Sequence, residues 1–340
     1  MSDIQYNLQL EKLCKILKLG EIITVPKAIV GGLLHKMYAV ETTQGKYAVK
    51  ALNPQIMLRP SARQHFINSE RIVNIALKSI PALSAKKFNG TFMQEIDKQF
   101  YIVFDWVDGR SLKSNEINII QCEKIGGILA DIHMIDFSKL YIINDCIDEV
   151  PLIDWKYYLK KGQENNTVWC NQLLEIIDKL YVWDAEANKS AKQLSSDMVI
   201  SHRDLDPKNV MWNGNNPIIV DWESAGYINP MQELLETAIY WSESFLGDID
   251  KKRFLAFVGA YKKKRYGKLQ ENWRLVLLSG LLGKLGWLEY SLKRSLWIEC
   301  TDAEEQQMGT EQVIETIKGI RCYADMINEL EKWLDNSSLN

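Results

Sequence analysis

The chain has 340 residues, which at roughly 150 residues per domain favours about two domains or lobes. It carries 41 Lys and Arg against 44 Asp and Glu, a net charge of −3, so no basic excess marks it as a partner of nucleic acid or of an anionic membrane. With 46% hydrophobic and 25% charged residues, the composition excludes a disordered or fibrous chain and is typical of a soluble globular protein.

The six cysteines are scattered without a C-x-x-C motif, which predicts reduced thiols and no disulfide framework. The start, MSDIQYNLQLEK, lacks the basic and apolar regions of a signal peptide. The most apolar run, Leu275–Gly283, has only nine residues, too few to span a membrane. The four histidines lie far apart, so we expect no zinc site. These features predict a cytoplasmic protein with no nucleic-acid or membrane partner. We expect a monomer or a homodimer, between which the sequence does not decide.

The first hundred residues alternate between helical and strand patterns. The predicted elements are a helix over residues 6–19, a hairpin with strands 37–41 and 46–52, a helix over 61–77, and strands over 87–94 and 100–105. Beyond residue 109 the pattern is mostly helical, except where two short apolar runs between residues 198 and 222 flank a polar loop. We therefore predict an α+β chain with a small β-rich part and a large helical part.

The polar loop carries the clearest chemical signal in the sequence. It reads SHRDLDPKNVMW from Ser201 to Trp212, and an apolar run then leads to Asp221. Asp204 and Asn209 are five residues apart, and Asp221 follows Asn209 by twelve. Phosphoryl transfer needs such a set: a carboxylate that accepts a hydroxyl proton, and oxygen ligands that hold Mg²⁺ on nucleotide phosphates. The alternative is a surface turn rich in Asp, Asn and Pro beside a strand.

This arrangement, H-x-D-x-x-x-x-N followed by an apolar strand and D-W-E, resembles the aminoglycoside phosphotransferase and choline kinase family of the protein-kinase-like superfamily. The resemblance implies a two-lobed protein-kinase-like fold, with an N-lobe over residues 1–104, a hinge over 105–110 and a helical C-lobe over 111–340. It implies that Asp204 is the catalytic base, that Asn209 and Asp221 bind Mg²⁺, and that His202 braces the loop. The helix around His133 resembles the L-A-x-L-H helix of small-molecule kinases, with His133 as a packing residue.

The resemblance also predicts a nucleotide site in the N-lobe. Lys50 lies in an alternating strand, on the face opposite Tyr47, Val49 and Ala51, and Glu70 follows on the next helix. An ion pair between Lys50 and Glu70 would aim the ammonium at the α- and β-phosphates. Taken alone, an exposed lysine and a solvent-facing glutamate would fit these letters as well.

Other positions complete the predicted nucleotide site. Gly31 and Gly32 lie where a phosphate-covering loop belongs, although two glycines before a strand are also common in turns. Asp105 and Val107 correspond to the hinge whose main chain recognises a purine edge. Lys208 is expected either to reach the transferring phosphate or to lie in solvent. ATP or GTP, together with Mg²⁺, are the expected cofactors.

The acceptor site is expected in the helical part, where residues 222–250 carry six acidic and no basic residues. Carboxylates interleaved with an aromatic ring suit a cationic acceptor, but a solvated acidic helix face would produce the same pattern. Glu223 could instead join the Mg²⁺ ligands. The predicted acceptor residues are Asp206, Glu223, Glu233, Glu236, Tyr240 and Glu243.

We therefore predict an ATP- or GTP-dependent phosphotransferase that modifies a hydroxyl of a small, cationic molecule, with the aminoglycoside type, as in antibiotic resistance, as first choice. A choline- or homoserine-type metabolite kinase is the alternative within this class. A catalytically idle, coat-associated structural protein of the same fold is the alternative outside it, and the presence of Lys50, Asp204, Asn209 and Asp221 argues against it.

Overall fold

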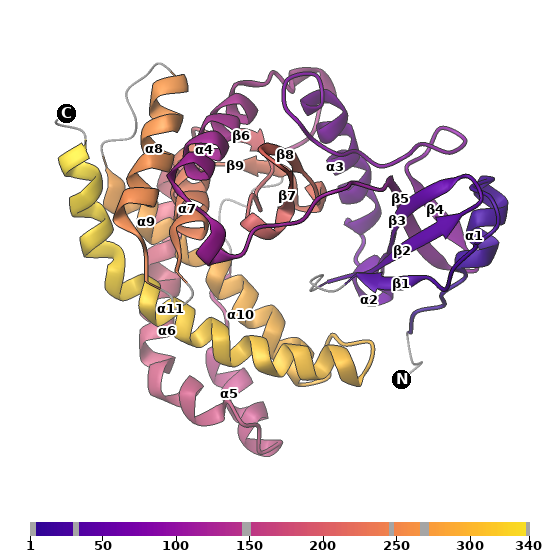
Figure 1. Cartoon of the computed structure of the whole chain (residues 1–340). Helices are drawn as coiled ribbons and strands as arrows, with labels where there is room; N and C mark the ends of the chain where they lie inside the picture. Colours follow the sequence, from indigo (N-terminus) through magenta and orange to yellow (C-terminus); the bar gives the residue numbers. More distant parts are fainter. Residues whose placement is uncertain (1–4, 30–33, 145–150, 245–247, 266–271, 338–340) are drawn as a thin grey trace. The chain divides into compact units, whose positions relative to one another are not determined.

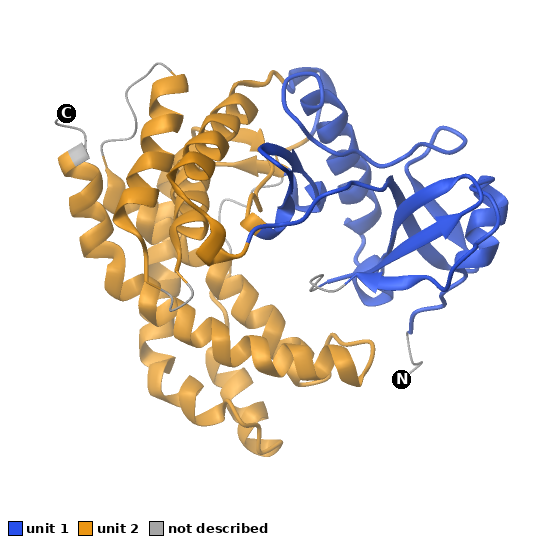
Figure 2. Cartoon of the chain, in the orientation of Figure 1, with its two compact units in different colours: residues 1–112, 137–142, 208–225 blue, residues 113–136, 143–207, 226–340 orange. Residues whose placement is uncertain are grey.

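The computed structural model describes residues 5–29, 34–144, 151–244, 248–265 and 272–337. The chain divides into two compact units, which Figure 2 colours separately. Unit 1 comprises residues 1–112, 137–142 and 208–225, and unit 2 comprises residues 113–136, 143–207 and 226–340. The fold is a mixed α+β fold, with the sheet in unit 1 and most helices in unit 2 (Figure 1). The lobe boundaries at residues 104 and 111 stay predictions.

Unit 1 contains a five-stranded antiparallel sheet with the strand order β1-β2-β3-β5-β4. Its strands are β1 (Lys27–Ile29), β2 (Lys36–Thr42), β3 (Gly45–Ala51), β4 (Met93–Ile96) and β5 (Gln99–Asp105). Its helices are α1 (Leu10–Leu17), α2 (Pro54–Met57), α3 (Ala62–Ala76) and the short 3₁₀ turn η2 (Ser138–Leu140). Strand β3 lies in the middle of the sheet, so its side chains contact a layer on each face.

The alternation predicted for β3 is confirmed by how its two faces pack. Tyr47 and Val49 join a core cluster with residues of α1. Leu52, just beyond the strand, packs in a second cluster with Phe66 of α3. Lys50 has the same parity as Leu52, so the pleat places it on the α3 face of the sheet.

A second hairpin belongs to unit 1 although it comes late in the chain. Strands β7 (Val210–Asn213) and β8 (Asn216–Ile219) pair with each other, and the Ile219 carbonyl accepts a hydrogen bond of 2.9 Å from the Leu83 N–H. Trp212 N–H donates to the Arg110 carbonyl at 2.8 Å. The preceding Gly109 has φ +155°, and a Cβ there would lie 2.7 Å from the Trp212 carbonyl oxygen, so only glycine fits.

Two predicted elements have different bounds in the structure. The first helix covers only Leu10–Leu17, because Lys18 takes a left-handed conformation that ends it. The strand predicted over 87–94 begins only at Met93. Asn89 and Gly90 both have positive φ, which produces a tight turn where a strand was expected.

Unit 2 is mostly helical. Its helices are α4 (Ile119–Met134), α5 (Trp155–Glu164), α6 (Cys170–Leu194), α7 (Pro230–Ser242), α8 (Lys251–Arg265), α9 (Trp273–Ser279), α10 (Leu281–Ser295) and α11 (Ala303–Ser337). Short elements are η1 (Ser114–Glu116), β6 (Val199–Ser201) and β9 (Gly226–Ile228), while η3 (Pro207–Asn209) and η4 (Trp222–Ser224) flank the β7–β8 hairpin. Helices α4 and α8 pack closely, since a Cβ at Gly126 would collide with the Phe257 carbonyl.

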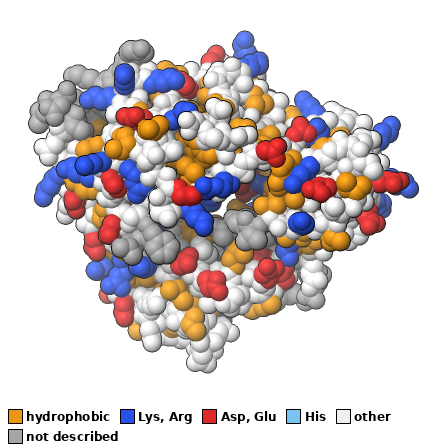
Figure 3. All heavy atoms as spheres, in the orientation of Figure 1, with side chains coloured by type: hydrophobic (Ala, Val, Ile, Leu, Met, Phe, Trp, Pro, Cys, Tyr) orange, Lys and Arg blue, Asp and Glu red, His pale blue; other side chains and the backbone are white. Residues whose placement is uncertain are grey.

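Charged side chains of both signs share the surface, as the nearly equal numbers of acidic and basic residues lead us to expect. Figure 3 shows acidic and basic side chains interspersed over the face it draws. The segment Trp273–Ser295 is long and apolar enough to cross a membrane, with a mean hydropathy of 1.2, yet half of that window is buried inside the fold. Core helices of soluble proteins have the same length and apolar composition, so this is weak evidence for a membrane span.

The cysteines among the described residues are free thiols.

Candidate functional site

Lys50 is the centre of a buried charge cluster in unit 1. Its ammonium lies 2.6 Å from Asp221 Oδ1 and 2.6 Å from Glu223 Oε2, and its side chain is only 7% exposed. Burial by itself would lower the pKa of Lys50, but the two carboxylates outweigh it and hold that pKa above its ordinary value. Lys50 is therefore a fixed positive charge.

Lys50 does not form the predicted ion pair with Glu70 but pairs with other carboxylates. Among the described residues, the Lys50 ammonium pairs with Asp221 and Glu223. Glu70 lies on α3 and accepts a hydrogen bond of 2.9 Å from the Ala85 N–H. Burial raises the pKa of Glu70 to about 7, against the opposing effects of that hydrogen bond and of Lys50. A buried carboxyl that is half protonated near neutral pH is a weaker counter-ion than the two carboxylates of the D-W-E segment.

Glu223 is held from several directions. Its carbonyl oxygen is 2.7 Å from His65 Nε2 and accepts a hydrogen bond of 3.2 Å from Ser69 Oγ, both on α3. Its carboxylate lies 3.5 Å from His35 Nε2. The other ring nitrogen of His35 accepts the Asn53 N–H at 2.9 Å. Burial, followed by the charge of Lys50, lowers the pKa of His35 to about 3, so the ring is neutral and its Nε2–H faces the carboxylate.

The β7–β8 hairpin brings Asn209 and Asp221 together at its open end. Val210 pairs with Ile219, and the Val220 N–H donates to the Asn209 carbonyl at 2.9 Å. Asp221 takes a left-handed conformation with φ +61°, a strained geometry for a residue with a Cβ. The hairpin therefore accounts for the spacing of twelve residues between the two predicted metal ligands.

The oxygen donors at this hairpin end suit Mg²⁺. The described residues contain no cluster of three or more His, Cys, Asp or Glu that could hold a metal ion. Mg²⁺ in nucleotide sites takes only one or two protein oxygens and completes its shell with phosphate oxygens and water. One amide and one carboxylate, with the Lys50 ammonium of β3 2.6 Å from that carboxylate, fit that pattern.

The remaining predicted nucleotide residues lie at different places. Gly31 and Gly32 lie outside the described residues. Asp105 ends β5 and forms an ion pair of 2.6 Å with Lys86. Val107 follows two residues after the end of β5, and no backbone–backbone hydrogen bond involves it among the described residues. Lys208 lies in η3 and is exposed.

The loop with Asp204 belongs to unit 2. His202 is fully buried, and its Nδ1 accepts a hydrogen bond of 3.2 Å from the Asp204 N–H. Arg203 has φ +66°, and the Leu205 carbonyl accepts a hydrogen bond of 2.8 Å from Trp241 Nε1. This geometry agrees with the bracing role that the resemblance implied for His202.

Glu233, predicted to contact the acceptor, instead holds this loop from inside the fold. Its Oε1 accepts the Arg203 N–H at 2.6 Å, and its Oε2 lies 2.7 Å from His133 Nε2. His133 Nδ1 lies 2.7 Å from the Tyr261 hydroxyl, so α4, α7 and α8 meet at this carboxylate. Burial would raise the pKa of Glu233, but the hydrogen bonds from His133 and from the Arg203 N–H keep it low. The prediction for Glu233 is corrected because the side chain is only 2% exposed.

Glu236 and Tyr240 lie further along α7, one and two turns beyond Glu233. Glu236 accepts a hydrogen bond of 3.0 Å from Gln232, and burial raises the pKa of Glu236 to about 7. The pKa of Tyr240 is also raised, by burial first and then by the negative charges of Glu236, Asp204 and Asp206. Those three carboxyl groups therefore lie within electrostatic reach of one phenol, as expected if they face a common acceptor.

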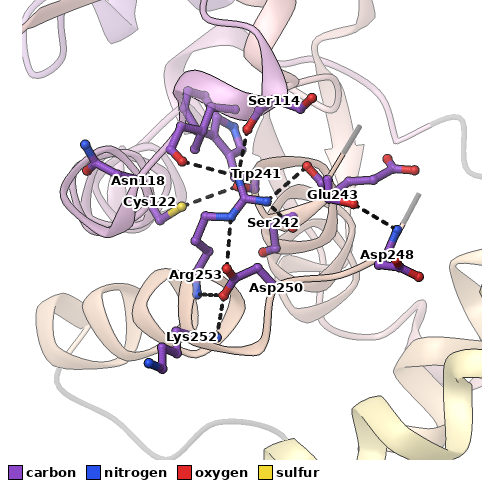
Figure 4. A network of polar contacts seen from close by, with 12 residues as sticks. Ser114, Asn118, Cys122, Trp241, Ser242, Glu243, Asp248, Asp250, Lys252 and Arg253 are labelled. Carbon is purple, nitrogen blue, oxygen red and sulfur yellow. Dashed lines mark hydrogen bonds and ion pairs between the residues drawn. The ribbon is translucent and has the colours of Figure 1, made fainter. Parts of the chain in front are cut away.

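Helix α7 ends in a network that fixes the main chain at Glu243 (Figure 4). The guanidinium of Arg253 donates to the Ser242 carbonyl at 2.7 Å and to the Glu243 carbonyl at 3.2 Å. It also donates to the Ser114 carbonyl at 3.0 Å, and Figure 4 shows these groups converging on one arginine. The carboxylate of Glu243 is exposed, so its backbone is fixed while its side chain reaches solvent.

Comparison with known proteins places this arrangement in a family. The profile of the phosphotransferase enzyme family, which includes the aminoglycoside phosphotransferases, matches residues 26–268, more than half of the chain. No curated protein matches the sequence.

Solved structures share the fold at low sequence identity. A choline kinase from Cryptosporidium parvum Iowa II is 13% identical with a TM-score of 0.60, and the match covers 97% of this chain and 99% of that one. A spectinomycin phosphotransferase in complex with ADP and spectinomycin is 11% identical with a TM-score of 0.64, covering 94% and 99%. An amicoumacin kinase in complex with AMP-PNP, Ca²⁺ and its substrate is 14% identical with a TM-score of 0.60, covering 92% and 94%.

Proposed function

Because this chain belongs to the phosphotransferase enzyme family, we propose that it transfers the γ-phosphoryl group of ATP or GTP to a hydroxyl of a small, amine-bearing molecule. An aminoglycoside-type acceptor is the first choice, and a choline- or homoserine-type metabolite is the second. The proposal places the protein in the cytoplasm, as a monomer or homodimer that requires Mg²⁺.

The observation that carries the proposal is the position of Lys50. Its buried ammonium lies 2.6 Å from Asp221, and the hairpin brings Asp221 beside Asn209. A fixed cation adjacent to two oxygen donors matches what nucleotide phosphates and their metal require. A structural ion pair alone gives no reason for the strained backbone at Asp221.

The chemistry follows from the proposed roles. Bound Mg²⁺ supplies charge neutralisation at the phosphates, and Asn209 and Asp221 would hold it. Lys50 orients the α- and β-phosphates. Asp204 accepts the proton of the acceptor hydroxyl as its oxygen attacks the γ-phosphorus. The bond from that phosphorus to the bridging oxygen breaks, and the nucleoside diphosphate leaves with the bonding electrons.

Two further observations support the proposed ligands. Structures with this fold have been solved with ADP and with AMP-PNP, and their partners include spectinomycin. In this chain, Glu236 and Tyr240 combine negative charge with an aromatic ring near Asp204, a combination suited to an amine. Their position on α7 makes that helix the proposed acceptor surface.

The test is nucleotide consumption by the purified protein. ATP and GTP, each with Mg²⁺, are supplied with amino sugars, macrolides, choline, ethanolamine and homoserine, and diphosphate release is followed. We expect acceptor-dependent release with at least one amine-bearing alcohol. Asp204→Asn should abolish it, whereas Asp178→Asn, an exposed aspartate on α6, serves as the matched control and should keep full activity. A protein without affinity for either nucleotide would support the idle structural alternative.

A further inference from the structure

Lys284 on α10 has an unusual environment in unit 2. Its ammonium lies 5.5 Å from the centre of the Tyr240 ring and 5.0 Å from the centre of the Tyr323 ring. The Tyr323 hydroxyl donates to the Leu277 carbonyl at 2.6 Å, which fixes that ring. Lys284 is the one charged residue between Arg274 and Glu289, within an apolar stretch of sequence. A half-buried lysine between two fixed rings is a positioned charge.

The Lys284 ammonium has no hydrogen bond or ion pair among the residues that the structure describes, and its contacts there are the two rings. Ring faces attract a cation but accept none of its N–H groups in the way that an oxygen does. A desolvated ammonium gains most from a negatively charged oxygen. Its three donors are therefore available to a ligand.

The charges around Lys284 link it to the proposed acceptor surface. Glu236 and Glu243 are the carboxylates that act on its ammonium, although burial, the larger effect, lowers the pKa of Lys284. Tyr240, one of its two rings, is itself influenced by Glu236 and by Asp204, the proposed base. One patch of unit 2 therefore presents a positioned cation and carboxylates together.

We propose that Lys284 selects the acceptor: its ammonium binds an acid oxygen, while Glu236 and Glu243 bind the amine, so that the phosphorylated molecule is a zwitterionic alcohol. The inference rests on the proposed phosphoryl transfer to a small amine-bearing alcohol. Within that class it favours an amino-acid alcohol of the homoserine type over the aminoglycoside type, which carries amines but no acid group. An acceptor with amines but no acid group would place a second positive charge beside the Lys284 ammonium. An acceptor with an acid group beside its amine satisfies both signs of charge.

Matched pairs of acceptors test the proposal directly. L-serine and ethanolamine differ only by a carboxylate, as do L-homoserine and 3-aminopropan-1-ol. With Mg²⁺ and ATP, kcat/KM is measured for each member from ADP release. A hydrogen bond between charged groups is worth about 1.5–3 kcal/mol, so the acid-bearing member should be preferred by roughly ten- to 150-fold. Lys284→Gln should reduce that ratio to within about threefold, and Lys284→Arg should preserve most of it.

Lys293→Gln is the matched control. It removes one positive charge from the same helix, where Lys293 pairs with Glu289 at 3.0 Å, and it should leave the ratio unchanged. The ratio in the unmodified protein needs no variant, so misfolding of Lys284→Gln cannot hide the answer. Equal or better use of the amine-only members, or an unchanged ratio in Lys284→Gln, overturns the inference and leaves phosphoryl transfer standing. Failure to bind ADP at all overturns the proposed function instead.

Discussion

Replacement of Glu233 separates a structural role from a substrate-binding role. In the unmodified protein, the Arg203 N–H lies 2.6 Å from Glu233 Oε1 and His133 Nε2 lies 2.7 Å from Glu233 Oε2. Glu233→Ala leaves both of these donors without a partner. Each orphaned donor costs about 1–3 kcal/mol, so the loss is about 2–6 kcal/mol. For a unit of this size, that corresponds to a fall in Tm of roughly 10 °C.

Glu233→Gln should be milder. Its amide oxygen still accepts the Arg203 N–H. Its NH₂ group donates to His133 Nε2 once the imidazole proton lies on Nδ1, from which the ring donates to the Tyr261 hydroxyl. We expect a loss of only about 1 kcal/mol, in line with one altered hydrogen bond. Thermal unfolding followed by circular dichroism measures both variants.

The pH dependence follows from the lowered pKa of Glu233. A carboxyl whose folded pKa lies below its ordinary value of 4.5 stabilises the fold above that value, and the contribution is lost as pH falls through the folded pKa. The stability advantage of the unmodified protein over Glu233→Gln should therefore hold at pH 7 and shrink below about pH 4.5. Unchanged stability of Glu233→Ala, with a raised acceptor KM, would refute the structural role and restore Glu233 to the acceptor site.

Three further substitutions test other parts of the account. Lys50→Met should lower kcat/KM by about a hundredfold or more, because the ammonium that orients the nucleotide phosphates is lost. Near-normal steady-state kinetics of this variant would remove Lys50 from the mechanism. Because burial raises the pKa of Glu236 to about 7, the KM of an amine-bearing acceptor should fall between pH 6 and pH 8 as that carboxyl ionises. Glu236→Gln should flatten this pH profile of KM, and an equally steep profile in the variant would exclude Glu236 from acceptor binding. Gly109→Ala should destabilise the protein by about 1–3 kcal/mol in urea unfolding because of the contact with Trp212, and an unchanged midpoint would contradict that packing.

Local patterns predicted much of the sheet in unit 1. The alternation of Tyr47, Val49 and Ala51 was enough to place Lys50 on the α3 face, because side chains on a strand alternate strictly. Of the two short apolar runs around the loop, one corresponds to β6 and the other falls on β8, whereas β7, which pairs with β8 and brings Asn209 beside Asp221, was not among the predicted elements. The family resemblance was confirmed by the match over residues 26–268.

Contacts between distant segments could not be read from the sequence. Three carboxylates were available to Lys50, and nothing in their spacing showed that Asp221 and Glu223, about 170 residues away, would pair with it in place of Glu70. On α7, the pattern grouped Glu233 with Glu236 because both lie on the polar side of the apolar stripe. That Glu233 is the more deeply buried of the two depends on its contact with His133, a hundred residues earlier.

The sequence around Lys284 is itself unusual. A single lysine in an otherwise apolar stretch of helix has to be either solvent-facing or matched by a specific environment. Only the structure shows the two rings beside it, since Tyr240 and Tyr323 come from different helices. The acceptor class is therefore the part of the function that depends most on tertiary structure.

Binding of Mn²⁺ in the presence of ADP tests whether Asn209 and Asp221 hold a nucleotide-bound metal ion, because Mn²⁺ substitutes for Mg²⁺ and its electron paramagnetic resonance signal reports the bound fraction. We expect binding that requires ADP and weakens at least about tenfold in Asn209→Ala and in Asp221→Asn, while Asp204→Asn binds within a few fold of the unmodified protein. Equal Mn²⁺ affinity in all of these proteins, or none in the unmodified one, would contradict the proposed nucleotide site.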